Sequence, residues 1–237
     1  ILFPKGIQFS WAKKHFNCPL IFMEHSSTFN YKLNFRDRYS LNIIKPKIDK
    51  IIAVSEVLKN ELIPYFNESK INIVPNHINT KLFQPVVKEE KNKTEFLHIS
   101  TLDENIKNPK GMIDACKLLI DQEIFDFHFT ILSDEPTVKW EKYVKDLKLE
   151  SYISFKGPFE WDAIPSFYQK SDCFILFSKY ETFSIVLAEA WACGIPTIST
   201  PVGIAKNLPS EIGLLVTDEN IYELAVAMTK IIKKEIN

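Results

Sequence analysis

Short apolar runs alternate along this chain with segments in which apolar residues recur at helical spacing. The apolar runs predict buried strands at residues 20–25, 50–54, 71–74, 95–100, 127–132, 152–155, 173–177 and 196–199. The periodic segments predict helices at residues 7–17, 32–46, 56–63, 110–121, 138–147, 161–169, 184–193 and 222–232. An alternation of this kind is typical of parallel sheets whose strands are joined by helices, so we predict an α/β protein.

The composition changes between residues 75 and 93, where prolines, asparagines and a charged run replace the alternating pattern. Such a segment is the best candidate for a linker between domains. We therefore predict part of one Rossmann-like, doubly wound domain in residues 1–78, a linker at 79–93, and a second such domain of about five strands in 94–237. Because the chain begins with Ile1 instead of Met, we expect it to be a piece of a longer protein.

Residues 178–198 hold the most informative local pattern in the chain. Ser184 precedes an apolar helical run at the position of an N-cap, and Gly194 follows the run where a helix should stop. The unpaired N–H groups of the first helical turn would then attract an anion such as a phosphate. Glu181 lies before this helix, and Glu189 lies within it, about 7.5 Å along the axis from its start. That separation is comparable to the step from the phosphates of a nucleotide to its ribose hydroxyls.

Composition and charge limit the kinds of molecule that the protein is expected to bind. The 237 residues are 46% hydrophobic and 25% charged, as is ordinary for a globular protein. The formal net charge of −1 and the dispersed basic residues argue against nucleic acid as a partner. Lys230, Lys233 and Lys234 share the polar side of the last predicted helix, which is either a solvated face or a site of peripheral membrane contact. No apolar run approaches the ~18 residues typical of a transmembrane helix.

Several kinds of chemistry find no support in the sequence. The four cysteines are far apart, and Cys173 and Cys193 fall in apolar runs, so we expect free thiols in a reducing compartment. The five histidines lack the spacing of metal ligands, and no bound metal is expected. The patterns G-x-G-x-x-G, G-x-x-x-x-G-K-[ST] and G-x-S-x-G do not occur. A dinucleotide-binding unit, a P-loop and a nucleophilic serine triad are therefore not favoured.

A set of motifs follows in a fixed order over nearly the whole chain. I-A-V-S-E-V-L-K-N-E-L and I-N-I-V-P-N-H-I-N-T-K-L-F-Q-P come first, I-S-T-L-D-E-N-I-K-N-P-K-G-M-I-D-A next, and Y-E-T-F-S-I-V-L-A-E-A-W-A-C-G-I-P-T-I last. Together they resemble the retaining glycosyltransferases of family 4, which have the GT-B fold, and the last motif resembles their E-x7-E signature. The resemblance implies that residues 1–78 are the C-terminal part of the acceptor-side domain, 79–93 the interdomain linker, and 94–237 the domain that binds the nucleotide-sugar donor.

The resemblance also implies catalytic roles for three residues, Lys107, Glu181 and His25. Lys107 is similar to the basic residue that binds the phosphates and stabilises the departing nucleoside diphosphate, although Lys110 is a rival for this role. Glu181 is similar to the residue that contacts the transferred sugar near its 3- and 4-hydroxyls. His25 is similar to the acceptor-domain histidine that reaches across the cleft to the donor sugar.

The implied donor-binding set is larger. Glu189 resembles the residue that holds the ribose hydroxyls, and the backbone amides of Phe183 and Ser184 resemble those that hold the sugar or the diphosphate. The other members are Thr182, Thr101, Gly157 and Pro158. Two positions depart from the family pattern. Thr101 stands where an arginine is common, which removes one diphosphate contact, and Ser133 replaces a glycine, which implies a less open loop.

We therefore expect retaining, metal-independent transfer of a sugar from a UDP- or GDP-sugar to a carbohydrate or lipid-linked acceptor, in cell-surface polysaccharide or lipopolysaccharide synthesis. The nucleotide sugar is a substrate, and no cofactor is expected. The expected location is the cytoplasm, either free or at the inner face of the plasma membrane. Two alternatives stay open: a non-catalytic relative that binds a nucleotide sugar, which Thr101 favours, and a GT-B sugar-nucleotide epimerase.

Overall fold

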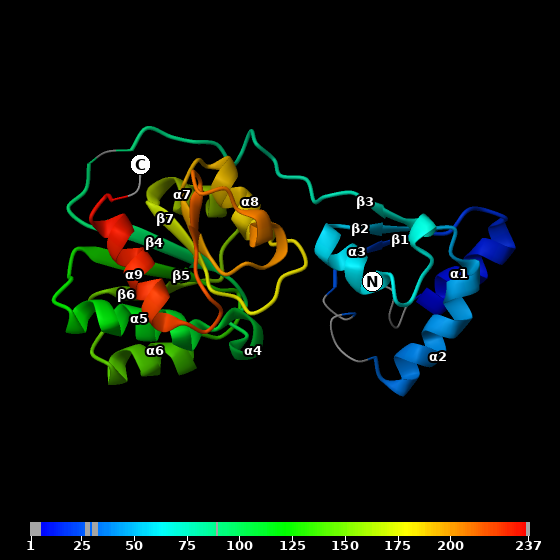
Figure 1. Ribbon diagram of the computed structural model, residues 1–237, viewed down its shortest axis with the longest axis horizontal. Coiled ribbons are helices and arrows are strands. Elements are labelled where there is room, and N and C mark those ends of the chain that lie inside the picture. Colours follow the sequence, from blue (N-terminus) through cyan, green and yellow to red (C-terminus); the bar gives the residue numbers. More distant parts are fainter. Residues whose placement is uncertain (1–5, 27–28, 30–32, 89, 236–237) are drawn as a thin grey trace. The chain divides into compact units, whose positions relative to one another are not determined.

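The computed structural model describes residues 6–26, 29, 33–88 and 90–235 (Figure 1). The chain divides into two compact units, Ile1–His77 with Glu181–Phe183, and Ile78–Tyr180 with Ser184–Asn237. Each unit contains one sheet, and every strand pairing in both sheets is parallel. The α/β architecture predicted from the alternation of strands and helices is confirmed.

The first unit contains a three-stranded sheet in the order β1-β2-β3. Its elements are α1 (Gly6–Phe16), β1 (Ile21–Glu24), α2 (Phe35–Ile44), β2 (Lys50–Ala53), α3 (Glu56–Leu62) and β3 (Ile71–Ile73), with 3₁₀ turns at Lys45–Lys47 and Glu68–Lys70. Side-chain caps fix the starts of two helices. The Asn34 side chain accepts a hydrogen bond from a backbone N–H in the first turn of α2 at 2.9 Å. Ser55 does the same for the N–H of Leu58 in α3 at 3.1 Å.

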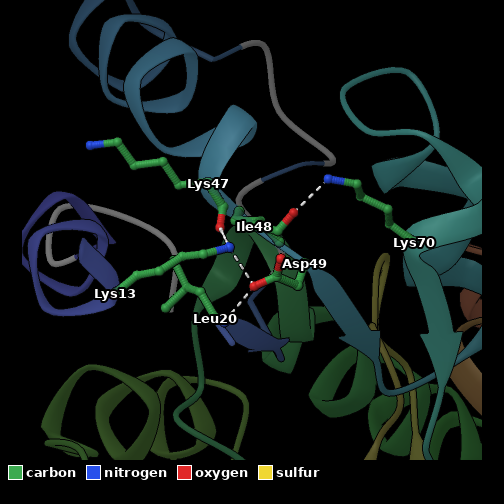
Figure 2. Close-up of polar contacts among 6 residues, drawn as sticks. All are labelled: Lys13, Leu20, Lys47, Ile48, Asp49 and Lys70. Atoms are coloured by element: carbon green, nitrogen blue, oxygen red, sulfur yellow. Dashed lines mark hydrogen bonds and ion pairs between the residues drawn. The ribbon is translucent and has the colours of Figure 1, made fainter. Parts of the chain in front are cut away.

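The segment that leads into β2 is held by polar contacts (Figure 2). Lys13 of α1 donates to the carbonyl oxygen of Lys47 at 2.9 Å and to the carboxylate of Asp49 at 2.6 Å. The same carboxylate oxygen accepts from the backbone N–H of Leu20 at 2.7 Å. These two hydrogen bonds, first the one from Lys13, hold the pKa of Asp49 below its ordinary value. One exposed carboxylate thus connects α1 to the starts of β1 and β2.

The second unit contains a six-stranded sheet in the order β6-β5-β4-β7-β8-β9. Its strands are β4 (Thr94–Ile99), β5 (Phe127–Leu132), β6 (Ile153–Lys156), β7 (Cys173–Leu176), β8 (Thr197–Ser199) and β9 (Gly213–Leu215). Its helices are α4 (Glu104–Lys107), α5 (Pro109–Asp121), α6 (Val138–Asp146), α7 (Ile164–Lys170), α8 (Ile185–Ala192) and α9 (Ile221–Ile232), with 3₁₀ turns at Trp161–Ala163 and Gly203–Asn207. The chain builds outward from β4 to β6, then returns to pair β7 with β4. In open α/β sheets, ligands bind at such a switch point, outside the carboxyl ends of the strands.

Helices cover both faces of this sheet (Figure 1). On one face lie α5, α6 and α9, whose buried side chains include Met112, Trp140 and Met228. On the opposite face lie α7 and α8, which contribute Tyr168 and Leu187 to a second core cluster. The central strands are therefore covered on both sides, and all four residues of β7 are buried, as is typical of a doubly wound sheet.

The sheet has one strand more than the five that the apolar runs predict. The additional strand, β9, has only three residues and starts at Gly213, which weakens its strand pattern. The glycine allows close approach to β8, because a Cβ at Gly213 would lie 2.3 Å from the carbonyl oxygen of Thr197. The helix predicted at 161–169 begins as a 3₁₀ turn and becomes α-helical only at Ile164.

Candidate functional site

The carboxyl edge of the six-stranded sheet collects most of the residues that the sequence singles out. They follow β4 (Thr101 and Lys107), β6 (Gly157 and Pro158) and β7 (Ser184), with Glu189 in α8. Because all six strands are parallel, the loops that carry these residues leave the sheet at the same edge. The candidate site of the second unit is therefore this edge, centred on the switch point between β4 and β7.

The loops after β4 and β7 are joined across the switch point. The backbone N–H of Lys179 donates to the carbonyl oxygen of Ile106 at 2.7 Å. The ammonium group of Lys179 pairs with the carboxylate of Glu219 in the segment before α9. The helix α4, which ends at Lys107, is therefore fixed beside the loop that leads to α8.

A buried histidine holds the loop after β4. The ring of His98 is fully buried, with Nδ1 at 2.8 Å from the carbonyl oxygen of Ile175 and Nε2 at 2.7 Å from the hydroxyl of Ser100. Since a carbonyl only accepts, Nδ1 carries the proton, and Nε2 accepts from Ser100. The Ser100 oxygen in turn accepts from the N–H of Leu102 at 3.0 Å, so the backbone on both sides of Thr101 is held. Burial lowers the pKa of His98 to about 4, which keeps the ring neutral near pH 7.

The two lysines that compete for the phosphate-binding role lie in different surroundings. Lys107 is the last residue of α4 and is half-buried. Lys110 is exposed on α5, and its ammonium group donates to the carboxylate of Asp114 at 2.6 Å. That hydrogen bond is the main reason why the pKa of Lys110 is raised. Lys110 thus has a carboxylate partner on its own helix, and the phosphate-binding role of Lys107 stays a prediction.

Ser184 occupies the N-cap position of α8, but its side chain does not cap the helix. Its φ of 75° and ψ of 79° lie in the left-handed region, whereas a capping serine has extended backbone angles. In this conformation the hydroxyl does not accept a hydrogen bond from the first helical turn. Ser184 is thus the N-cap residue, as predicted, but its hydroxyl does not cap the helix. Gly194, with a φ of 69°, lies just past the end of the helix as predicted.

Glu189 is buried in α8 and bonded to a residue that the sequence pattern does not single out. The residue is 7% exposed, and its Oε2 atom accepts a hydrogen bond from the hydroxyl of Tyr168 at 2.9 Å. Tyr168 comes from α7, and its ring packs against Phe83 and Phe174. Burial raises the pKa of Glu189, and the bond from Tyr168 opposes this rise. A tyrosine on an apolar helix face is typical of core packing, so the sequence alone gives no signal for this contact.

The loop after β6 is shaped by a close backbone contact. Gly157 has a φ of 141°, and a Cβ there would lie 1.8 Å from the carbonyl oxygen of Ser133. The hydroxyl of Ser133 accepts from the N–H of Glu135 at 3.1 Å, and the residue is buried. Ser133 therefore stabilises the turn after β5, while the glycine next to Pro158 is the residue that this contact requires.

The remaining predicted residues group with the first unit: His25, Glu181, Thr182 and Phe183. His25 follows β1 and is exposed. The carboxylate of Glu24, which is 2% exposed, accepts from the backbone N–H groups of His25 at 3.0 Å and of Ser26 at 2.8 Å. This buried carboxylate, which the sequence pattern does not mark, holds the main chain at His25. The reach of His25 to a donor sugar stays a prediction.

A cavity of about 710 Å³ lies elsewhere, at the amino-terminal edge of the same sheet. It is lined by residues at or just before the starts of four strands, Thr94, Asp172, Pro196 and Gly213, and by the end of α9. None of the predicted site residues lines it. Ligands of open α/β sheets bind at the carboxyl edge, so we do not assign the donor site to this cavity.

The structure also bears on metal binding, on membrane-spanning helices and on the cysteines. Across residues 6–26, 29, 33–88 and 90–235, no group of three or more His, Cys, Asp or Glu side chains is arranged to hold a metal ion. Within the same ranges, no helix combines the length and the apolar character needed to cross a membrane. The four cysteines are free thiols; Cys18 is exposed, and Cys116, Cys173 and Cys193 are buried.

Comparison with known families agrees with this architecture. The model described as glycosyl transferases group 1 matches residues 93–234, and the model described as glycosyltransferase family 4 matches residues 3–82. The first match alone covers more than half of the chain. The fold and the matched sequence define a glycosyltransferase of the GT-B type. The chain belongs to the group 1 glycosyl transferases, with a family 4 match over residues 3–82.

Individual relatives are distant and longer. An uncharacterized glycosyltransferase of Methanocaldococcus jannaschii is 27% identical over 237 residues, which is 98% of this chain and 64% of that protein. Mannosylfructose-phosphate synthase of Agrobacterium fabrum is 26% identical over 210 residues, or 80% of this chain and 46% of that protein. The structure of Anabaena HepE in complex with UDP-glucose has a TM-score of 0.81 at 20% identity, and the match covers 97% of this chain and 67% of HepE. The chain thus spans about half to two thirds of the curated relatives it matches.

Proposed function

We propose that the protein transfers a sugar from a nucleoside-diphosphate sugar to a carbohydrate or lipid-linked acceptor, with retention of configuration and without a metal ion. The observation that carries this proposal is the buried carboxylate of Glu189. It lies in α8, which follows the loop at the switch point, and it accepts a hydrogen bond from Tyr168. A buried carboxylate is costly unless it is hydrogen-bonded, and ribose hydroxyls are suitable donors to it. The HepE structure contains UDP-glucose, which supports a UDP-sugar as the first donor to test; a GDP-sugar is the alternative.

In the proposed mechanism, the protein stabilises the negative charge that grows on the departing diphosphate. The first-turn N–H groups of α8 and the ammonium group of Lys107 supply this stabilisation. Glu189 holds the ribose, while Glu181 and His25 contact the transferred sugar. The leaving phosphate assists the acceptor on the same face of the sugar, so no protein nucleophile takes part.

We place the reaction in the synthesis of a cell-surface polysaccharide or lipopolysaccharide, at the inner face of the plasma membrane. Three lysines at the end of α9, Lys230, Lys233 and Lys234, are exposed and support contact with an anionic surface. Flotation of the protein with vesicles containing anionic lipid tests this part of the proposal. Flotation that is equal with neutral vesicles contradicts it.

The function is tested on the full-length protein by a thermal-shift screen of UDP-, GDP- and ADP-sugars. A stabilising donor is then incubated with acceptors, and the configuration of the product is read by NMR. Transfer with retention, unchanged by EDTA, is the expected result. Binding without transfer or hydrolysis would favour the non-catalytic alternative, for which Thr101 in the loop after β4 is the best support. A change in the configuration of the donor sugar itself would favour the epimerase.

The two neighbouring lysines provide a matched pair for the phosphate-binding role. We expect Lys107→Ala to lower kcat by about 10²–10³-fold, the loss typical of one stabilising donor at a developing anion. Lys110→Ala is the control, because that ammonium group is already paired with Asp114 at 2.6 Å. Steady-state kinetics with the donor from the screen compare the variants. Equal losses in both, or a loss only in Lys110→Ala, contradict the assignment.

A further inference from the structure

A series of three hydrogen bonds crosses the switch point from β7 to the loop after β4. The imidazole of His98 donates from Nδ1 to the carbonyl oxygen of Ile175 at 2.8 Å, and its Nε2 accepts from the hydroxyl of Ser100 at 2.7 Å. The Ser100 oxygen accepts in turn from the backbone N–H of Leu102 at 3.0 Å. The main chain on both sides of Thr101 is thereby linked to β7.

The first of these bonds lies just beyond the backbone pairing of the two strands. The pairing of β4 with β7 reaches Leu97 and Phe174. At the next residue, the imidazole of His98 bonds to β7 instead, and its ring stacks on Phe174 at a centroid distance of 6.4 Å. A buried polar ring costs stability unless its nitrogens are hydrogen-bonded, and both nitrogens are. An apolar side chain at this position would remove the acceptor that orients the hydroxyl of Ser100.

Leu102, at the end of the series, adopts a backbone conformation that leucine avoids. Its φ of 57° lies in the left-handed region, and its side chain is buried in the core cluster that includes Met112 of α5. Such a conformation persists only where the surroundings hold it, here through the bond to Ser100 and the burial of the side chain. The loop therefore turns at Leu102, leaves Thr101 exposed, and continues into α4, which ends at Lys107.

The charge of Lys107 acts on the ring of His98. Burial lowers the pKa of His98 most, the bond to Ile175 opposes this, and the positive charge of Lys107 lowers the pKa further. A protonated ring would repel Lys107, and its Nε2 could no longer accept from Ser100. The neutral form of the ring is therefore the form that suits both the series of bonds and a cation in this loop.

A second histidine–serine pair in the same sheet joins two strands instead of a strand and a loop. The Nε2 atom of His128 lies 2.9 Å from the hydroxyl of Ser154, so this pair connects β5 with β6. The pair of His98 and Ser100 differs because its next bond leaves the sheet, at the carboxyl edge where open α/β sheets bind ligands.

We propose that His98 is a positioning residue for the transfer reaction, because through Ser100 it fixes the loop that presents Thr101 and Lys107 to the sugar donor. This inference rests on the proposed function and adds to it two residues that act through the loop. A displaced loop would move the ammonium group of Lys107 away from the charge that grows on the leaving group. Small displacements of this kind cost up to about 10²-fold in rate, even when the substituted residue is remote from the chemistry.

The test separates positioning from packing with variants of the full-length protein. Ser100→Ala removes the hydroxyl, and Ser100→Thr keeps it. His98→Asn keeps an amide that can donate to Ile175 but removes the acceptor for Ser100. Ser154→Ala is the matched control, because it also removes a hydroxyl bonded to a histidine. Values of kcat and donor KM are measured well below the thermal midpoint of each variant, and hydrogen exchange is followed in residues 101–107.

We expect Ser100→Ala and His98→Asn each to lower kcat about ten- to hundredfold with little change in donor KM, as for a group misplaced in the transition state. Ser100→Thr keeps most of the activity. The double variant of His98→Asn and Ser100→Ala loses no more than the greater single loss, because both substitutions break the same series of bonds. Exchange in residues 101–107 is faster in Ser100→Ala than in Ser154→Ala, whose kcat is unchanged.

A kcat for Ser100→Ala equal to that of Ser154→Ala overturns the inference and leaves the proposed function standing. Losses that multiply in the double variant, or a Ser100→Thr variant as slow as Ser100→Ala, also overturn it. If His98→Asn does not fold, the serine variants alone decide. If the unsubstituted protein transfers sugar from none of the UDP-, GDP- and ADP-sugars, the proposed function fails and the inference fails with it.

Discussion

Glu189 shows how one side chain couples burial, protonation and binding. Burial raises its pKa above the ordinary value of 4.5, and the hydrogen bond from Tyr168 opposes this with a smaller effect. For a carboxyl whose folded pKa is raised, the stabilising contribution is complete below the unfolded pKa and is lost as the pH rises through the folded pKa. The ionised form that the proposed donor binding requires is therefore maintained at a cost to stability above about pH 4.5.

We expect Glu189→Gln to weaken donor binding strongly without loss of stability at neutral pH. Glutamine keeps an oxygen that can accept from Tyr168 but removes the charge, so donor Kd should rise by about 10–150-fold. Urea unfolding at increasing pH above about 4.5 should show a growing stability difference in favour of the variant. Glu150→Gln, at an exposed position, serves as the control. Unchanged donor affinity would remove Glu189 from the site.

We expect Tyr168→Phe to lower the free energy of unfolding by about 1–3 kcal/mol, because a buried hydroxyl that donates to Glu189 is lost. The pKa of Glu189 should rise further, since the bond from Tyr168 lowers it. Donor binding in the variant should therefore weaken at a higher pH than in the unsubstituted protein as the solution is acidified. Tyr222→Phe, where the ring is 67% exposed, should change neither property. A pH profile of binding that does not move would show that Tyr168 acts through packing alone.

At the scale of single residues, sequence reasoning singled out candidate site residues but not the contacts that hold them. Glu189 could be singled out because a carboxylate among apolar helix positions needs a partner. Its partner Tyr168 could not be singled out, because the two residues lie on different helices, 21 positions apart in the sequence, and leave no local pattern. The N-cap position of Ser184 was predicted, but its left-handed φ was not, because side-chain type alone does not determine φ.

At the scale of elements, the strands and helices that span several residues were predictable, since each has its own periodicity. The strand at 127–132 has the predicted bounds, and α5 and α9 differ from prediction by one residue at the start. Two short elements, β9 and α4, were not predicted. β9 exists because its backbone pairs with β8, and α4 because Asp103 caps a four-residue turn, with its side chain accepting from the N–H of Asn105 at 2.9 Å.

The polar contacts of Asp49 give a prediction for α1 (Figure 2). We expect Asp49→Ala to speed amide hydrogen exchange in α1, because the carboxylate holds Lys13 at 2.6 Å and Leu20 at 2.7 Å. The pKa of Asp49 is lowered, so its contribution is present above the ordinary value of 3.8 and is lost as the pH falls through the folded pKa. Added salt should weaken the Lys13 pair, which is partly exposed.

Hydrogen exchange read by mass spectrometry compares α1 with α2 in the same molecule. Asp146→Ala, an exposed substitution on α6, controls for loss of a surface carboxylate. Equal acceleration in α1 and α2 would indicate general destabilisation of the first unit. Unchanged exchange in α1 would show that other contacts are sufficient to hold it.

At the scale of the whole molecule, the reactivity of the cysteine thiols reports unfolding. Burial raises the pKa of Cys116, Cys173 and Cys193, in the last case to about 11, and all three lie in the second unit. We expect one thiol in four, the exposed Cys18, to react rapidly with a disulfide reagent under native conditions. All four should react in urea, and donor should slow the three buried thiols because it stabilises the folded state. Rapid reaction of more than one thiol would contradict the described packing.

The pairing of β4 with β7 has a consequence for the order in which the strands form during folding. His98 and Ile175, which are hydrogen-bonded across this junction, are 77 residues apart, whereas β4 and β5 are close in the chain. Long loops close at an entropic cost before any contact rewards them, so β7 should dock late in folding. A chain that grows from its N-terminus also completes β4, β5 and β6 before β7 and α8 exist. The proposed affinity for a nucleotide should therefore be acquired late in the folding of the second unit, so nucleotide binding would report completed folding.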